Sequence, residues 1–366
     1  MTNNFLKLNI LKDFQLSKED TINFHKNYSD VQSEIKQKVK PCECLLCSSS
    51  NKPFCNSHSI PRECLTQIAK DGKVKNFNGI IEVPALDEEQ GLNSTGTFRL
   101  ICRECDNLVF KKYETFENYK SRGFITDEIM NQIALKNYLK FLSKKLIEKE
   151  GIPIFVKKMN IPVLFRDFDK TEKWDVRDAQ LNFKKTKALL GNNSIKNYYR
   201  LIMYEELNYT VPYAFQCHIN LVTDFARNLI NNLYDFSRDN SLQDIHICIF
   251  PYKGKSFIIV FTKSIYKKYV NFINKFNEFN LEDRLAIINY IVFLYSEDYY
   301  YSPYLPKDIM SKIFSIARLT PISIENSSEQ KVLKSAIELY DLNNWNNIPN
   351  LLCKEYSMES LSYDIP

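Results

Sequence analysis

Apolar residues recur at helical spacing in one long stretch near the middle of the chain. Positions three or four residues apart are held by Leu135, Leu139, Leu142 and Leu146. This spacing predicts a helix over Thr126–Glu150. Gly151 and Pro153 follow it, and both residue types end helices. Lysines at positions 136, 140 and 144 share a neighbouring face of the same helix.

The second half of the chain predicts a mixed α/β domain. Two apolar runs, Ile245–Phe250 and Ser256–Thr262, flank a turn at Lys253–Gly254, which is typical of a β-hairpin. Helices are predicted at Asn220–Phe236, Ile265–Phe276 and Leu281–Tyr295. The tyrosine-rich stretch 298–303 is interpreted as a packed helix end rather than as a stacking platform.

The first part of the chain divides into a polar segment and a cysteine-rich segment. Residues 1–41 are predicted to be helical, and strands are predicted at Asn78–Val83 and Thr97–Cys102 with an acidic loop, Asp87–Gly96, between them. The predicted organisation is therefore a helical segment 1–41, a cysteine-rich module 42–120, a connecting basic helix 121–151 and an α/β domain 152–366. The fold class is α+β.

Composition supports a globular, helix-rich protein. The 366 residues are 44% hydrophobic and 25% charged, with only 8 glycines. No apolar run reaches the roughly 20 residues that a membrane span needs, so no membrane association is expected. The start of the sequence lacks the pattern of a signal peptide, which predicts a cytoplasmic protein. In that compartment the ten cysteines are expected to be free or bound to metal.

Two CxxC pairs carry the clearest chemical signal. Cys44 and Cys47 form one pair, and Cys102 and Cys105 form the other. Two such turns can supply the four thiolates of a tetrahedral structural zinc site. An alternative zinc set would use Cys44, Cys47, Cys55 and His58, but it leaves the second pair unexplained. A redox dithiol is disfavoured, because no thioredoxin-like βαβ pattern surrounds either pair.

The residues around these pairs resemble the HNH (ββα-metal) endonuclease superfamily, in particular its zinc-stapled branch with the phage endonuclease VII resolvases. The matching residues are His58-Ser-Ile60-Pro61 between the pairs and Asp106 directly after Cys105. The resemblance covers residues 42–120. It implies a zinc-stabilised, treble-clef-like ββα-metal module, a catalytic Mg²⁺ or Mn²⁺ bound by Asp106, and cleavage of DNA, often in defence against foreign DNA or in mobile elements.

The residue types suit phosphodiester hydrolysis. The imidazole of His58 suits a general base at neutral pH. Asp106, in the first turn of a predicted helix, offers hard oxygen ligands to Mg²⁺ or Mn²⁺, and Glu114 lies two turns further along the same face. Taken without the motif, Asp106 is better explained as a helix N-cap, and only its position after the last cysteine makes the two explanations about equal.

One position departs from the family pattern. The residue before the catalytic histidine is often a metal ligand in the family, whereas here it is Ser57. Either water and fewer protein ligands hold the metal, or Glu114 or Glu63 substitutes, or the site is inactive. Asn93 and Thr97 are weak candidates for the family's orienting asparagine.

These features predict a metal-dependent DNA endonuclease, with RNA not distinguished from DNA. Between 107 and 149 the chain carries nine Lys or Arg against five Asp or Glu. The residues expected to contact phosphates there are Lys111, Lys112, Lys136, Lys140 and Lys144. Double-strand cleavage would need a homodimer or two sequential nicks. The alternative is a non-catalytic zinc module that binds nucleic acid or protein.

Overall fold

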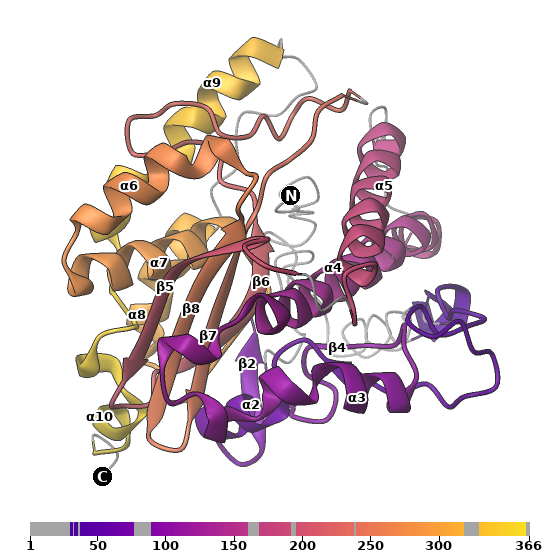
Figure 1. Ribbon diagram of the computed structural model, residues 1–366, viewed down its shortest axis with the longest axis horizontal. Helices are drawn as coiled ribbons and strands as arrows, with labels where there is room; N and C mark the ends of the chain where they lie inside the picture. The colour runs from indigo at the N-terminus through magenta and orange to yellow at the C-terminus, as the bar shows by residue number, and fades with distance from the viewer. Residues whose placement is uncertain are drawn as a thin grey trace.

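The computed structural model describes residues 30–31, 33–35, 37–76, 89–159, 168–191, 195–237, 239–317 and 329–363. The protein is a mixed α/β structure in which helices cover both faces of a large antiparallel sheet (Figure 1). The predicted strand Asn78–Val83 and most of the predicted helical segment 1–41 lie outside the described residues. No helix within these ranges combines the length and apolar character needed to cross a membrane.

The large sheet has seven strands, all paired antiparallel. In spatial order they are β3 (Glu89–Gly91), β2 (Lys73–Asn76), β9 (Tyr299–Tyr301), β6 (Tyr213–Ile219), β7 (Ile245–Tyr252), β8 (Lys255–Lys263) and β5 (Tyr199–Leu207). Strands β2 and β3 come from the cysteine-rich part of the sequence, and β9 joins them to β6. The sheet therefore extends beyond residues 152–366.

The predicted hairpin is confirmed as β7 and β8. Its two turn residues, Lys253 and Gly254, both have positive φ, at 46° and 75°. This is the backbone of a type I′ turn, whose twist matches that of the flanking strands. Both strands are buried on both faces, with Ile247 facing one core and Phe250 the other. Burial on both faces explains why the two segments are continuously apolar.

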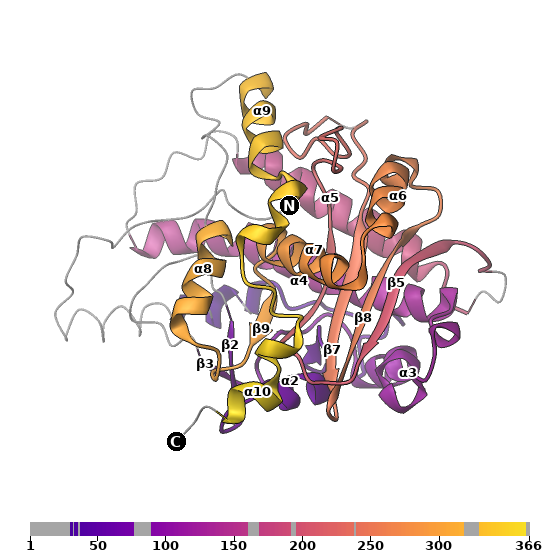
Figure 2. The ribbon, with the colours of Figure 1, turned by 90° about the vertical axis from the view of Figure 1, so that its left-hand side faces the viewer.

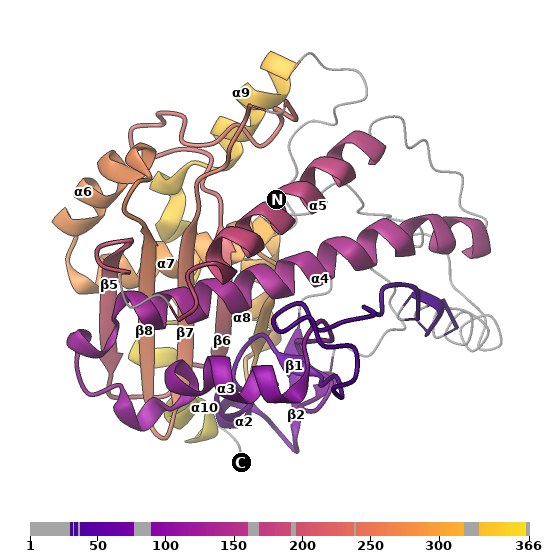
Figure 3. The same ribbon diagram turned by 45° about the vertical axis from the view of Figure 1, so that its right-hand side comes forward.

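Two hydrophobic cores lie on opposite faces of the sheet. On one face pack α6 (Val270–Glu278), α7 (Leu281–Tyr295) and α8 (Lys307–Ala317) (Figure 2). On the other face pack α3 (Arg103–Glu114) and α4 (Asp127–Met159), with part of α5 (Phe168–Lys187) (Figure 3). The C-terminal part adds α9 (Glu329–Leu339) and α10 (Met358–Tyr363). The boundaries of α7 agree with those predicted.

The predicted end of the long helix is wrong. Helix α4 continues through Gly151 and Pro153 to Met159. A Cβ at position 151 would lie 2.8 Å from Cδ1 of Ile35. The glycine therefore permits a close contact with another segment instead of ending the helix. Packing outweighs the intrinsic preference of both residues here.

The helix predicted at Asn220–Phe236 is absent, and the segment is irregular. Asp224 Oδ1 accepts hydrogen bonds from the backbone N–H groups of Ala226 and Asn228, both at 2.9 Å. Asn231 Nδ2 donates to the carbonyl oxygen of Leu221 at 2.7 Å. Such short polar side chains satisfy the backbone locally and compete with helix formation.

Three smaller predictions need correction. The tyrosines of β9 are packed, as expected, but they form a strand between β2 and β6 instead of a helix end. The acidic stretch predicted as a loop contains β3. Helix α6 begins at Val270 rather than Ile265, after the 3₁₀ turn Lys267–Tyr269.

Candidate metal centre and adjoining site

The two CxxC pairs come together at the start of α3. The four sulfur atoms of Cys44, Cys47, Cys102 and Cys105 all lie within 4.8 Å of one another. Cys47 Sγ is 3.8 Å from Cys102 Sγ. A tetrahedral ion with Zn–S bonds of about 2.3 Å places its sulfurs roughly 3.8 Å apart. The four cysteines therefore have the donor type and spacing of a structural zinc site.

Local backbone geometry positions both pairs. The Cys44 turn is closed by a hydrogen bond from Ser48 N to Cys44 O at 2.7 Å, and Ser48 has a φ of 56°. Cys102 is the N-cap of α3, and its sulfur accepts from Cys105 N at 3.5 Å. Cys44 Sγ accepts from Cys102 N at 3.2 Å, which links the two turns directly.

The electrostatics of the four thiols favour a bound cation. Burial opposes ionisation of Cys44, but backbone N–H groups outweigh it and lower its pKa to about 7. Burial and the neighbouring sulfurs raise the pKa of Cys102 and of Cys105. Four thiolates this close repel one another, and a divalent cation removes that repulsion. Zn²⁺ bound here would fix the Cys44 turn to the first turn of α3.

The alternative zinc set is not assembled. Cys55 Sγ faces Asp106 Oδ2 at 3.7 Å, and burial together with that carboxylate raises the pKa of Cys55 to about 12. His58 Nε2 lies 2.9 Å from the carbonyl oxygen of Leu92. Within the described ranges, the four-cysteine set is the one group of three or more His, Cys, Asp or Glu side chains close enough to share an ion.

His58 lies on a short two-stranded sheet beside the cysteines. Strand β1 (Ser57–His58) pairs antiparallel with β4 (Thr97–Phe98), and α2 (Arg62–Ile68) follows β1. Because a carbonyl oxygen only accepts, Nε2 of His58 carries the proton of the neutral ring. Nδ1 then holds the lone pair, and the side chain is half-buried. A base of this kind requires an accessible lone pair.

Asp106 directs its carboxylate toward the residue that precedes His58. Its Oδ1 accepts from Ser57 Oγ at 2.6 Å and from Lys136 Nζ at 2.8 Å. Burial alone would raise the pKa of Asp106, but Lys136 and the hydrogen bonds lower it below its ordinary value. The carboxylate is therefore ionised, and Ser57 contacts the same oxygen atom that Lys136 contacts.

Lys136 also contacts the second predicted acidic residue. Its Nζ lies 3.0 Å from Oε1 of Glu114 and 4.1 Å from the centre of the Phe110 ring. The side chain of Lys136 is 1% exposed, whereas those of Asp106 and Glu114 are 21% and 31% exposed. The structure thus brings Asp106 and Glu114 together, as predicted, but around an ammonium group.

This arrangement does not fit a divalent cation. Mg²⁺ and Mn²⁺ require several oxygen ligands converging on one point. Here an ammonium lies within hydrogen-bonding distance of both carboxylates, and His58 does not join them in a group that could share an ion. The other acidic candidate, Glu63, is exposed in the first turn of α2.

The predicted basic residues divide into exposed and buried ones. Lys111 and Lys112 are exposed on α3, and Lys112 pairs with Glu128. Lys140 and Lys144 are half-buried, and Lys144 Nζ lies 3.2 Å from Asp298 Oδ2. The predicted phosphate contact of Lys136 does not agree with the structure, because its side chain is buried against Phe110 and two carboxylates. Lys136 is therefore not available to a nucleic-acid phosphate in this conformation.

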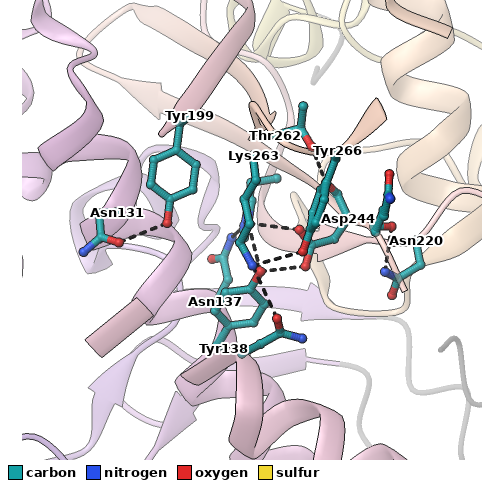
Figure 4. A network of polar contacts seen from close by, with 12 residues as sticks. Asn131, Asn137, Tyr138, Tyr199, Asn220, Asp244, Thr262, Lys263 and Tyr266 are labelled. Carbon is teal, nitrogen blue, oxygen red and sulfur yellow. Dashed lines mark hydrogen bonds and ion pairs between the residues drawn. The ribbon is translucent and has the colours of Figure 1, made fainter. Parts of the chain in front are cut away.

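A buried polar network next to Lys136 was not predicted. The next two residues of α4, Asn137 and Tyr138, bind the sheet (Figure 4). Tyr138 OH donates to Asp244 Oδ2 at 2.6 Å, and Asn137 Nδ2 lies 3.0 Å from Nδ1 of His246. Nearby, Lys263 Nζ lies 3.1 Å from Tyr266 OH. Helix α4 packs between a sheet and a second helix, so it is buried on several sides and polar residues are buried with it. The leucine spacing alone identifies only one of these buried sides.

Comparison of the chain with protein-family models, with curated proteins and with solved structures gave no match.

Proposed function

We propose that the chain is an HNH-type nuclease that hydrolyses phosphodiester bonds in nucleic acid, with His58 as the general base. The observation that carries this proposal is the hydrogen bond from Ser57 to Asp106, 2.6 Å long, beside a four-cysteine centre. It joins the residue before His58 to the residue after the last cysteine. In the zinc-stapled HNH nucleases that the sequence resembles, the residue at the first position is often a metal ligand, and the residue at the second position binds the same metal.

The surroundings of His58 support a role as base. The Leu92 carbonyl fixes one ring nitrogen, so the lone pair of the neutral ring is at Nδ1. An imidazole in this state can accept a proton from the water that attacks phosphorus. Zinc at the four cysteines would hold the Cys44 turn and α3 together next to the β1–β4 strand pair, so that His58 keeps its place relative to Asp106.

The substrate class follows from exposed basic residues on α3. Lys111 and Lys112 lie on the solvent side of the helix that carries Asp106. Contacts from lysine to phosphate are independent of base sequence and weaken as salt rises. DNA is the proposed substrate, and cleavage of both strands would need a dimer or two nicks.

The test is cleavage of supercoiled plasmid by full-length, zinc-loaded protein, with and without added Mg²⁺ or Mn²⁺. Wild type should produce nicked or linear plasmid, and His58→Ala should not. Glu104→Gln is the matched control, because Glu104 is exposed on the same module and pairs with Lys52. Equal cleavage by wild type and His58→Ala would remove His58 from the reaction.

A second function, a non-catalytic zinc module that binds nucleic acid or protein, is favoured by Lys136. A buried ammonium that pairs with both Asp106 and Glu114 leaves neither carboxylate free for a metal. In this case wild type would contain zinc and bind DNA but leave plasmid intact under every cation condition.

A further inference from the structure

Lys136 is more deeply buried than its two acidic partners. Its side chain is 1% exposed, and its ammonium contacts Asp106 at 2.8 Å and Glu114 at 3.0 Å. The ring of Phe110, 4.1 Å away, adds a cation–π contact from a third direction. A buried charge persists only when its surroundings compensate the loss of water, and these three groups provide that compensation.

The remaining hydrogen bonds of Asp106 come from uncharged groups. Ser57 Oγ donates to Oδ1, and Cys55 Sγ faces Oδ2 at 3.7 Å. Because the pKa of Cys55 is raised to about 12, it remains a neutral thiol. Among the described residues in contact with the Asp106 carboxylate, Lys136 is thus the one that brings positive charge.

The position of Lys136 is set by the large sheet. Asn137 accepts from Gln216 Nε2 at 3.0 Å, and Tyr138 donates to Asp244 at 2.6 Å. Both partners belong to the sheet region, and both are at most 2% exposed. Gln216 Nε2 also lies 3.5 Å from the hydroxyl of Tyr113, the residue before Glu114. A shift of α4 large enough to withdraw Lys136 would have to break these buried hydrogen bonds.

We infer that Lys136, and not a divalent cation, is the resident cation of the Asp106–Glu114 pair, so that any divalent cation binds there only by displacing Lys136. This inference goes beyond the proposed function, because it concerns the charge balance of the pair and not the hydrolysis of nucleic acid. The ion pairs themselves do not depend on that function.

The carboxylates of Asp106 and Glu114 can remain in place when Lys136 is replaced. Asp106 and Glu114 are each more than one-fifth exposed, so water can reach both carboxylates when the ammonium is removed. Asp106 also keeps its hydrogen bond from Ser57. Lys136→Met preserves most of the apolar stem that packs near Phe110 and removes the charge. The freed pair should then attract a small, hard cation.

The experiment is titration of zinc-loaded, full-length protein with Mn²⁺, following free Mn²⁺ by electron paramagnetic resonance. Wild type and Asp106→Asn should bind Mn²⁺ equally weakly. Lys136→Met should gain one site at least tenfold tighter, and the double variant Lys136→Met/Asp106→Asn should lose it. Lys112→Met is the matched control, since it removes a lysine from the exposed pair with Glu128 and should behave as wild type.

Two results would overturn the inference. One is a Mn²⁺ site in wild type, as tight as the one expected for Lys136→Met, that disappears in Asp106→Asn, because Lys136 would then not hinder the ion. The other is a folded Lys136→Met protein that binds Mn²⁺ no better than wild type. If Lys136→Met does not fold, the comparison of wild type with Asp106→Asn decides alone. If wild type does not cleave plasmid, the nuclease proposal fails. The Mn²⁺ titration does not depend on cleavage and still tests the inference.

Discussion

Removal of the metal at the four cysteines should release one segment of the protein and leave the large sheet intact. Residues 42–56 are joined to residues 100–103 by three backbone hydrogen bonds. They run from Leu45 N to Leu100 O at 3.1 Å, from Cys55 N to Ile101 O at 3.3 Å and from Arg103 N to Pro53 O at 3.0 Å. A fourth bond, from Lys187 Nζ to Leu45 O at 2.7 Å, ties the segment to α5.

A comparison of the free energies contributed by the hydrogen bonds and by zinc identifies the metal as the main attachment of residues 42–56. Each of these hydrogen bonds contributes about 1 kcal/mol net, so that the four contribute about 4 kcal/mol. A structural zinc site contributes on the order of 10 kcal/mol at neutral pH. Ordering 15 residues opposes both, at about 1 kcal/mol or more for each residue. Hydrogen bonds alone therefore cannot hold this segment, whereas β7 and β8 are buried on both faces by the two hydrophobic cores.

The assay is amide hydrogen exchange read by mass spectrometry on Cys47→Ser, with Cys42→Ser as the control. Cys42 is exposed and lies outside the four-cysteine set, so its replacement should change neither zinc content nor exchange. Cys47→Ser should lose zinc and exchange rapidly over 42–56, with β7 still protected. Unchanged protection of 42–56 in zinc-free Cys47→Ser would refute the assignment of the metal as the main attachment.

Three further predictions concern pH, backbone strain and nucleic-acid binding. Burial lowers the pKa of His218 to about 3 and also lowers that of His246. The unfolded chain binds these protons from about pH 6.5 downward. Stability should therefore fall as the pH drops from 6.5, by about 1.4 kcal/mol per pH unit for each ring. Urea unfolding at several pH values measures this, and His218→Phe should flatten the dependence. Gly96→Ala should lower the melting temperature more than Gly191→Ala. Both glycines have positive φ, but a Cβ at 96 would lie 2.9 Å from a tyrosine hydroxyl oxygen, whereas nothing lies within 4 Å at 191. Equal melting temperatures would contradict this steric account. Lys111→Ala should weaken DNA binding and reduce the slope of log affinity against log salt by about 1, measured by fluorescence anisotropy. An unchanged slope would remove this lysine from the interface.

The sequence predicts the local elements best where one short pattern determines them. The β7–β8 hairpin follows from two apolar runs around Lys253–Gly254, and the four-cysteine centre follows from the CxxC spacing. Helix α4 shows the limit of this reasoning. Its leucine spacing predicts a helix, but only tertiary contacts carry it past Gly151, where Ile35 packs closely.

The candidate site shows the same limit. The position of Asp106 and Glu114 on one face follows from their spacing on one helix, and the nearness of Asp106 to Ser57 follows from the family resemblance. The role of Lys136 does not follow from either. A lysine on a leucine-patterned helix is usually solvated, and its burial here depends on how α3 and α4 pack against each other. Long-range packing of this kind cannot be derived from local periodicity.

Chemical rescue tests the proposed nuclease most directly, because it isolates the function of the His58 imidazole. Zinc-loaded His58→Ala is incubated with supercoiled plasmid in the presence and absence of free imidazole, alongside wild type. Cleavage by wild type, loss in the variant and partial return with imidazole are the predicted results. Wild-type rates in His58→Ala without imidazole, or intact plasmid with fully zinc-loaded wild type under every cation condition, would contradict the assignment.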